Sequence, residues 1–220
     1  MRAMILAAGR GERMRPLTDK TPKPLLEIGG KPLIIHQIER LRAGGFEQIV
    51  INLAWLGRQI EQRLGDGSEW GVSIAYSHEP AGALETAGGI RHALELLGDQ
   101  PFVVVNSDIL SDYPMARLRE MCFNALAHLV LVKNPPHHET GDFALSCGRV
   151  KLGGGPRHTY SGIGLYDPAL FVGLEAGFRP LRPVLEQAIA AGRVGGELHA
   201  GLWIDIGTPE RLRQIDADFD

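Results

Sequence analysis

The N-terminal segment combines a glycine turn with positively charged side chains, a combination that could bind phosphate. Gly9 and Gly11 follow the apolar run 3–8. Glycine lets the backbone turn tightly, and successive N–H groups in such a turn form a concave anion site. Arg13 adds a permanently charged, forked donor, and Lys23 stands between two prolines that restrict its backbone. This segment therefore predicts a site for the phosphates of a nucleotide.

Two aspartates are the candidate metal ligands. Asp108 follows the apolar run 102–106, and Asp205 follows the run 202–204. If both runs are strands of one sheet, both carboxylates reach its carboxyl edge. Carboxylate oxygens suit Mg²⁺, which also binds substrate phosphates. The pair therefore predicts a Mg²⁺ site that is completed by the nucleotide and water.

Side-chain nucleophiles are not indicated. His137 and His138 are adjacent, so they point apart on an extended chain, and they have no Cys or His partner at ligand spacing. We expect them to lie in a solvated loop. Since no Ser–His or Cys–His arrangement is apparent, catalysis is expected to depend on positioning and charge neutralisation of phosphates.

The elements that must position these groups begin with alternating strands and helices. Apolar runs predict strands at 3–8, 48–52 and 72–76, and helical periodicity predicts helices over 32–41 and 56–64. This alternation is typical of a parallel sheet with helices on both faces. Ligands of such sheets bind outside the carboxyl ends of the strands, where the glycine turn falls.

The rest of the chain is expected to add further strands and helices, including an antiparallel portion. Thr86 is expected to cap one of these helices, and Thr208 to cap the last. Strands 149–152 and 159–166 are expected to flank the loop 153–156. The remaining elements are predicted as helices over 90–97, 114–121 and 181–191 and strands over 102–106, 127–132, 194–199 and 202–204.

A dinucleotide-binding fold is the obvious alternative. It would require a third glycine where Arg13 stands, and a helix that opens directly from the turn. Instead, Pro16 and the run 22–24 delay the first helix. The dinucleotide interpretation is therefore disfavoured.

The strings LAAGRGERMRPLT at 6–18 and PKP at 22–24 resemble the signature of the sugar-1-phosphate nucleotidylyltransferases, and the resemblance extends to DIGT at 205–208. It implies an α/β, Rossmann-like nucleotidyltransferase fold: a mixed, mostly parallel sheet with helices on both faces and a small antiparallel sugar-binding portion. We expect a single domain over 1–220. Its nucleotide-binding part would span about 1–110 and its sugar-binding part about 111–220.

The resemblance also implies a transferase that joins a nucleoside triphosphate to a sugar 1-phosphate, releases pyrophosphate and uses Mg²⁺. The segment LETAGG at 84–89 is similar to that of family members that use UTP and N-acetylmuramate 1-phosphate in cell-wall recycling. One alternative is another specificity, such as mannose-1-phosphate guanylyltransferase. The other is a non-catalytic nucleotide-sugar-binding regulator, which the presence of all the charged candidate residues disfavours.

Residue roles follow from the resemblance by matching positions. Many members carry a Glu-Lys-Pro run whose lysine holds the sugar phosphate. This chain lacks that run, and Lys151 and Arg157 are the possible substitutes. The implied sites are Arg13 and Lys23 for catalysis; Leu6, Ala8, Gly9, Gly11, Glu12, Arg13, Lys23, Glu79, Gly82 and Gly88 for the nucleotide; Asn106, Asp142 and Gly162 for the sugar; and Asp108 and Asp205 for the metal.

Composition sets outer limits on function. The chain has 220 residues, of which 44% are apolar and 22% charged, as in ordinary globular proteins. A net charge of −3 disfavours nucleic acid as a partner, and no apolar run is long enough to cross a bilayer. Cys122 and Cys147 are expected to be free thiols of a cytoplasmic protein. The oligomeric state, monomer or small homo-oligomer, is left open.

Overall fold

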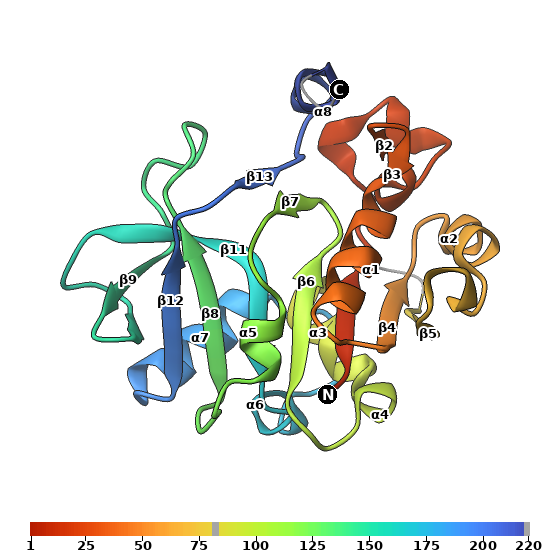
Figure 1. Ribbon diagram of the computed structural model, residues 1–220. Coiled ribbons are helices and arrows are strands. Elements are labelled where there is room, and N and C mark those ends of the chain that lie inside the picture. The colour runs from red at the N-terminus through yellow and green to blue at the C-terminus, as the bar shows by residue number, and fades with distance from the viewer. Residues whose placement is uncertain (81–83, 218–220) are drawn as a thin grey trace.

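The computed structural model describes residues 1–80 and 84–217, and these form a sheet of nine strands with helices on both faces (Figure 1). The spatial order of the strands differs from the chain order. Strands from the first half of the chain form one side of the sheet, and strands from the second half form the other side. In spatial order the strands are β5 (Ser73–His78), β4 (Gln48–Leu53), β1 (Ala3–Leu6), β6 (Phe102–Asn106), β11 (Arg157–Tyr166), β8 (Ala127–Val132), β12 (Val194–His199), β10 (Arg149–Lys151) and β9 (Phe143–Ser146).

The first four strands in this order are parallel, as the alternation of strands and helices predicts. Leu6 at the end of β1 is level with Asn52 of β4 and Asn106 of β6. The chain that follows each of these residues leaves the sheet at the same edge. This shared level places the glycine turn beside Asp108.

The other strands form the antiparallel portion. β11 is antiparallel to both β6 and β8, whereas β12 returns parallel to β8. The fold class predicted from the sequence is confirmed. One pairing was wrong: β10 and β11 do not pair with each other around 153–156. Both instead pair with β9, which lies between them, and β10 also pairs with β12.

Helices cover both faces of the sheet because alternate strand residues point to opposite sides. Ala3 and Ile5 of β1 pack into a core with α1, α2 and α5, while Met4 packs into a second core with α3, α4, α6 and α7. The helices are α1 (Leu33–Ala43), α2 (Gly57–Leu64), α3 (Glu85–His92), α4 (Leu94–Leu97), α5 (Ala116–Arg119), α6 (Ala169–Val172), α7 (Leu181–Ala190) and α8 (Pro209–Ala217).

A third, smaller core holds the C-terminal segment against the N-terminal one. It joins Met14 and Ile28 to Leu110, Ile206 and Ile215. Two short strand pairs support it: β2 (Glu27–Ile28) with β3 (Lys31–Pro32), and β7 (Ile109–Ser111) with β13 (Trp203–Asp205). The pairing of β7 with β13 brings Asp205 next to the strand that follows Asp108.

The boundaries of one predicted helix were wrong. The segment 90–97 is two helices, α3 and α4, and α3 begins five residues earlier, at Glu85. Thr86 therefore lies inside α3 and makes no capping hydrogen bond. The predicted cap of the last helix is confirmed, since the N–H of Arg211 donates to Thr208 Oγ1 over 3.3 Å.

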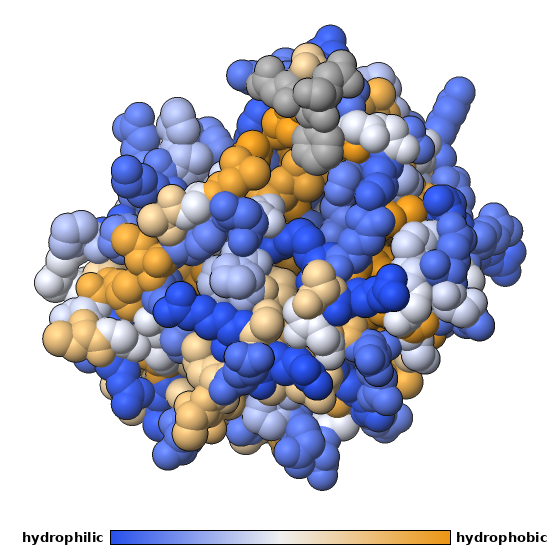
Figure 2. Space-filling view, in the orientation of Figure 1, coloured by the Kyte–Doolittle hydropathy of each residue, from blue (hydrophilic) through white to orange (hydrophobic). Residues whose placement is uncertain are grey.

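The face turned to the viewer is largely hydrophilic, and its apolar residues form separate patches (Figure 2). Exposed apolar side chains such as Val172 and Phe178 are 62% and 57% accessible. Within 1–80 and 84–217, no helix has the length and apolar character that crossing a membrane requires.

Candidate active site

A cavity of about 380 Å³ opens at the carboxyl ends of β1, β4 and β6. It contains most of the residues that the sequence predicted for nucleotide and metal. Ten of the predicted residues line it, from Leu6, Ala8, Gly9, Gly11, Glu12, Arg13, Lys23 and Glu79 to Asn106 and Asp108. The sequence and the geometry therefore point to the same place.

The glycine turn has a conformation that other residues rarely adopt. Gly11 has φ of +66°, and a Cβ atom there would lie 2.9 Å from Thr18 Cγ2 and 3.2 Å from Lys23 Cβ. Its carbonyl accepts hydrogen bonds from the N–H of Met14 at 2.8 Å and from the Thr18 hydroxyl at 2.9 Å. Gly11 thus brings the turn into direct contact with the lysine segment.

Side chains from α2 and from the turn before it hold the outside of this loop. Trp55 Nε1 donates to the carbonyl of Thr18 at 3.0 Å, and Gln59 Nε2 donates to that of Lys20 at 2.9 Å. Arg10 lies over the Trp55 ring, with 4.5 Å between Cζ and the ring centroid. The loop is therefore braced by tertiary contacts before any ligand binds.

Lys23 and Asp108 form an ion pair inside the cavity. Their side chains are only 11% and 27% exposed, so water screens the pair poorly. A lysine that faces a carboxylate here can neutralise either that carboxylate or an incoming phosphate. The site thus holds one positive charge and one carboxylate side by side.

A hydrogen-bonded chain forms the other wall of the cavity. Asn52 accepts from the N–H of Ala7 at 2.8 Å and donates to Glu79 Oε1 at 2.7 Å. Burial of Glu79 raises the pKa of its carboxyl, although the Asn52 hydrogen bond opposes the shift. Sequence reasoning missed Asn52, whose signal was a polar residue at the end of an otherwise apolar strand.

Asp205 approaches Asp108 through the backbone. The N–H of Ile206 donates to the carbonyl of Asp108 at 2.8 Å, and Gly207 lines the cavity. The Asp205 carboxylate itself contacts Arg211 Nη1 at 2.5 Å and His137 Nε2 at 3.0 Å. Asp205 therefore lies beside the cavity with Arg211 and His137 as partners of its own.

These carboxylates fit a hard cation whose remaining ligands come from elsewhere. Among the described residues, no cluster of three or more His, Cys, Asp or Glu could hold a metal ion by itself. Asp108 and Asp205 instead lie on adjoining backbone segments, and each is already paired with a positive charge, Lys23 and Arg211. Two oxygen donors suit Mg²⁺ only when phosphate and water complete its shell.

A second cavity of about 290 Å³ adjoins the first. The two share Leu6, Glu85, Thr86 and Asn106, so one ligand can extend from one into the other. The remaining walls of the second cavity come from β6, β9, β11 and α7: Val104, Asp142, Phe143, Tyr160, Pro180, Leu181, Arg182 and Leu185. Two residues predicted for the sugar, Asn106 and Asp142, belong to it.

Asp142 is held in place by several donors. Its Oδ2 accepts from the N–H of Tyr160 at 2.8 Å, while Oδ1 contacts His138 Nε2 at 3.2 Å. His138 and His137 thus contact different carboxylates, and the loop that carries them is not merely solvated as expected. Both histidines link this loop to the site.

Two of the predicted binding residues pack against other parts of the protein. Gly162, with φ of +79°, lies against Asn106, and a Cβ there would be 2.5 Å from Asn106 Nδ2. Gly88 is buried in α3 and packs against Gly177 and Arg179. Neither glycine is among the described residues that line these two cavities, and both allow close packing of protein on protein. Gly82 lies outside the described residues.

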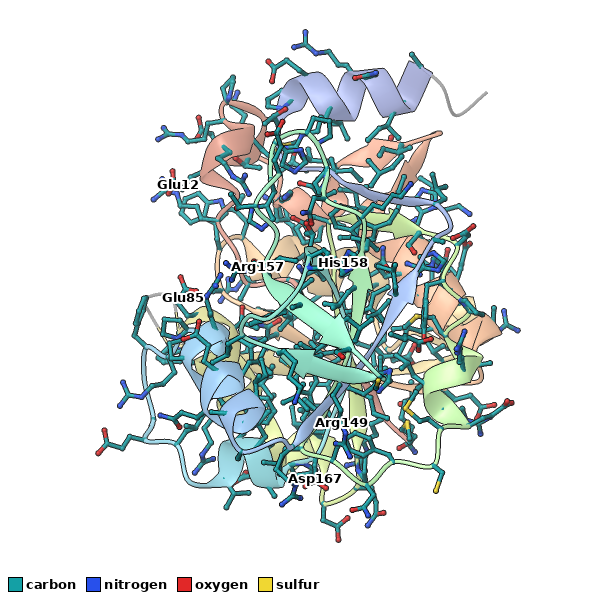
Figure 3. The ribbon with its side chains drawn as sticks, turned by 90° about the vertical axis from the view of Figure 1, so that its left-hand side faces the viewer. Glu12, Glu85, Arg149, Arg157, His158 and Asp167 are labelled. Carbon is teal, nitrogen blue, oxygen red and sulfur yellow. The ribbon has the colours of Figure 1, made fainter. Side chains whose placement is uncertain are left out.

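The structure also shows where the two proposed substitutes for the missing lysine lie. Arg157 donates to the carbonyl of Asp142 through Nε at 3.1 Å and Nη2 at 2.5 Å, and Lys151 is an exposed residue of β10. In Figure 3, Arg157 lies on the same side of the molecule as Glu12 and Glu85. Sequence reasoning missed Arg182, whose signal was a cation at the start of a helix.

The comparisons with known proteins agree with this geometry. The model of the nucleotidyl transferase family matches residues 2–143. The N-acetylmuramate alpha-1-phosphate uridylyltransferase of Neisseria meningitidis serogroup B is 56% identical over 99% of this chain and 97% of its own length. The protein of the same name from Caulobacter vibrioides is 34% identical over 98% and 95%.

A solved structure supports the fold alone. A putative glucose-1-phosphate thymidylyltransferase of Bacillus anthracis superposes with a TM-score of 0.87 at 24% identity, and the match covers 99% of this chain and 94% of that one. The family match covers well over half of the chain, and the sequence relatives cover nearly all of it. The chain therefore belongs to the nucleotidyl transferase family.

Proposed function

We propose that the protein transfers the uridylyl group of UTP to N-acetylmuramate 1-phosphate and so forms UDP-N-acetylmuramate and pyrophosphate. One observation carries the proposal: the glycine turn, Arg13, Lys23 and Asp108 line one cavity, and this cavity adjoins a second one of sugar size. The similarity to relatives named as uridylyltransferases of this sugar phosphate supports the choice of substrates.

The reaction needs no side-chain nucleophile. The phosphate oxygen of the sugar 1-phosphate is already an anion, and it attacks the α-phosphorus of UTP in line with the departing pyrophosphate. The N–H groups of Gly9 and Gly11 and the guanidinium of Arg13 hold the leaving phosphates. Lys23 leaves Asp108 and neutralises the charge that develops around the α-phosphate.

Asp108 and Asp205 would hold Mg²⁺, which supplies charge neutralisation on the phosphates when bound. Lys23, which faces Asp108 in the structure, would then be available to phosphate, and Arg211 would stay against Gly207 at the edge of the cavity. Each carboxylate thus faces one cationic side chain, Lys23 or Arg211.

The base and ribose lie between the 84–89 segment and the chain that links Ala7, Asn52 and Glu79. A half-buried carboxyl with a raised pKa can accept a hydrogen bond from a base or a ribose hydroxyl. The sugar lies in the second cavity, where the anchored carboxylate of Asp142 accepts from hydroxyl or amide groups.

Pyrophosphate release with single pairs of substrates tests the proposal. The panel combines UTP, GTP, CTP, ATP and dTTP with the 1-phosphates of N-acetylmuramate, N-acetylglucosamine, mannose and glucose. We expect UTP with N-acetylmuramate 1-phosphate to have the highest kcat/KM. A tenfold preference for GTP, about 1.4 kcal/mol, would instead assign the protein to the guanylyltransferases. Binding of UTP without turnover of any pair would indicate a regulator.

A further inference from the structure

Arg182 is the one cationic side chain among the residues that line the second cavity. The cavity's other ionisable side chains are the carboxylic acids Glu85 and Asp142 and the phenol Tyr160. Carboxylates attract the hydroxyl and amide hydrogens of a sugar but repel an anionic substituent. Any negative group on the sugar therefore has one cationic partner among the described residues that line this cavity.

The substrate of the proposed reaction carries such a group. N-acetylmuramate differs from N-acetylglucosamine by a lactyl ether that ends in a carboxylate. Planar carboxylates match the forked donors of arginine, which bind them through two parallel hydrogen bonds. Resting on the proposed function, we infer that Arg182 binds the lactyl carboxylate and so makes the enzyme prefer this sugar.

The surroundings of Arg182 place it at the cavity and leave it free to bind. It stands in the first turn of α7, with Cζ 5.6 Å from the ring centroid of buried Phe143. Its described polar contacts are Nε to Glu186 at 2.9 Å and Nη1 to Asp142 at 3.5 Å. A guanidinium has five N–H donors, so these contacts do not exhaust it.

Neither Asp142 nor Glu186 depends strongly on Arg182 to hold its position. Asp142 is already held by the N–H of Tyr160 and by His138, and its contact with Arg182 is the longest of the three. The pair with Glu186 joins side chains that are 51% and 41% exposed, and such surface pairs contribute little to stability. Arg182 can therefore turn to a ligand without unfolding the site.

The test compares two sugar 1-phosphates that differ only in the lactyl ether. Initial rates are measured with UTP and either N-acetylmuramate 1-phosphate or N-acetylglucosamine 1-phosphate for the wild type, Arg182→Ala and Arg182→Lys. Arg179→Ala is the matched control, because Arg179 precedes the same helix, is also paired with a glutamate and does not line the cavity.

We expect Arg182→Ala to lower kcat/KM at least about 30-fold for N-acetylmuramate 1-phosphate and less than about threefold for N-acetylglucosamine 1-phosphate. Arg182→Lys keeps the charge but loses the fork, so its loss for the lactyl sugar should be intermediate. Arg179→Ala should leave both values close to those of the wild type. The expected signature is a change in the ratio between sugars.

Two results for the variant would overturn the inference: equal losses for both sugars, or no loss for the lactyl sugar. Folding failure is recognised by the activity with N-acetylglucosamine 1-phosphate, which serves as an internal control in the same preparation. Failure of the proposed function is separate, because it shows in the wild type. A wild-type enzyme that does not prefer the lactyl sugar also overturns the inference, since no discrimination is then left to explain.

Discussion

The glycine turn, which we propose binds phosphate, and the second cavity, which we propose binds the sugar, are built in different ways. The turn is contiguous in sequence, and Gly9, Gly11 and Arg13 lie within five residues of one another. The sugar cavity is assembled from Asn106 of β6, Asp142 before β9, Tyr160 of β11 and Arg182 of α7. A short segment of sequence can specify the glycine turn. The sugar cavity exists only when strands that are distant in sequence pair with one another.

This difference matches the ligand that we propose for each region. Every nucleoside triphosphate has the same phosphates, so backbone N–H groups and permanent charges suffice for recognition. Sugars differ in single substituents, and discrimination between them requires side chains aimed from several directions. We therefore expect changes in the turn to affect all substrates equally, and changes in the sugar cavity to affect them selectively.

Lys23→Ala should produce the largest effect and should lower turnover for every substrate. A charge contact that strengthens in the transition state contributes about 3 kcal/mol, so kcat should fall about 100-fold or more. Steady-state pyrophosphate release measures the loss, and the thermal midpoint shows whether the variant is folded.

Lys20→Ala is the matched control, since Lys20 is an exposed lysine of the same loop outside the cavity. It should retain nearly full turnover. Near-normal turnover of a folded Lys23→Ala protein would contradict the assignment of Lys23.

Asp108→Asn and Asp205→Asn test whether the two halves of the chain share one metal site. The backbone bond from Ile206 to Asp108 brings a carboxylate from each half together. Each variant should lose about tenfold or more in activity at low Mg²⁺, and the double variant should be little worse than the worse single one, because groups that act as a unit are not additive.

Mg²⁺ titrations of activity for the wild type, both single variants and the double variant provide the measurement. If Asp205→Asn keeps full activity at low Mg²⁺, Asp205 only pairs with Arg211 and His137. The metal site would then depend on Asp108 alone.

Gly11→Ala and Gly9→Ala should separate two roles of glycine within the turn, with the smallest effects on turnover. Alanine at position 11 must adopt φ near +66° and press on Thr18 and Lys23, so we expect a loss of about 1–3 kcal/mol in the free energy of unfolding. A Cβ at position 9 meets nothing within 4 Å, and stability should change by less than about 0.5 kcal/mol.

Urea denaturation measures both stabilities, and the KM for UTP measures ligand contact. Gly9→Ala should raise KM because Gly9 lines the cavity. Equal stability losses in the two variants would show that the turn has no special conformation at Gly11.

The sequence by itself determined the α/β class, the parallel half of the sheet and the glycine turn at the ends of its strands. Those features depend on local patterns: apolar runs at strand spacing, helical periodicity, and glycine and proline at positions that restrict the backbone. Asp108 could also be predicted, since the end of a buried parallel strand is a position at the ligand edge wherever that strand lies in the sheet.

Only the tertiary structure decided which glycines face a ligand and which face protein. Gly11 and Gly162 look alike in sequence, yet Gly11 lines the cavity while Gly162 makes room for Asn106. It also decided that Arg157 contacts a backbone carbonyl and that Arg182 lines the sugar cavity. The reason is physical: the surroundings of a side chain depend on which strands pair across the sheet, and strand pairing brings together residues whose separation in the sequence carries no local signal.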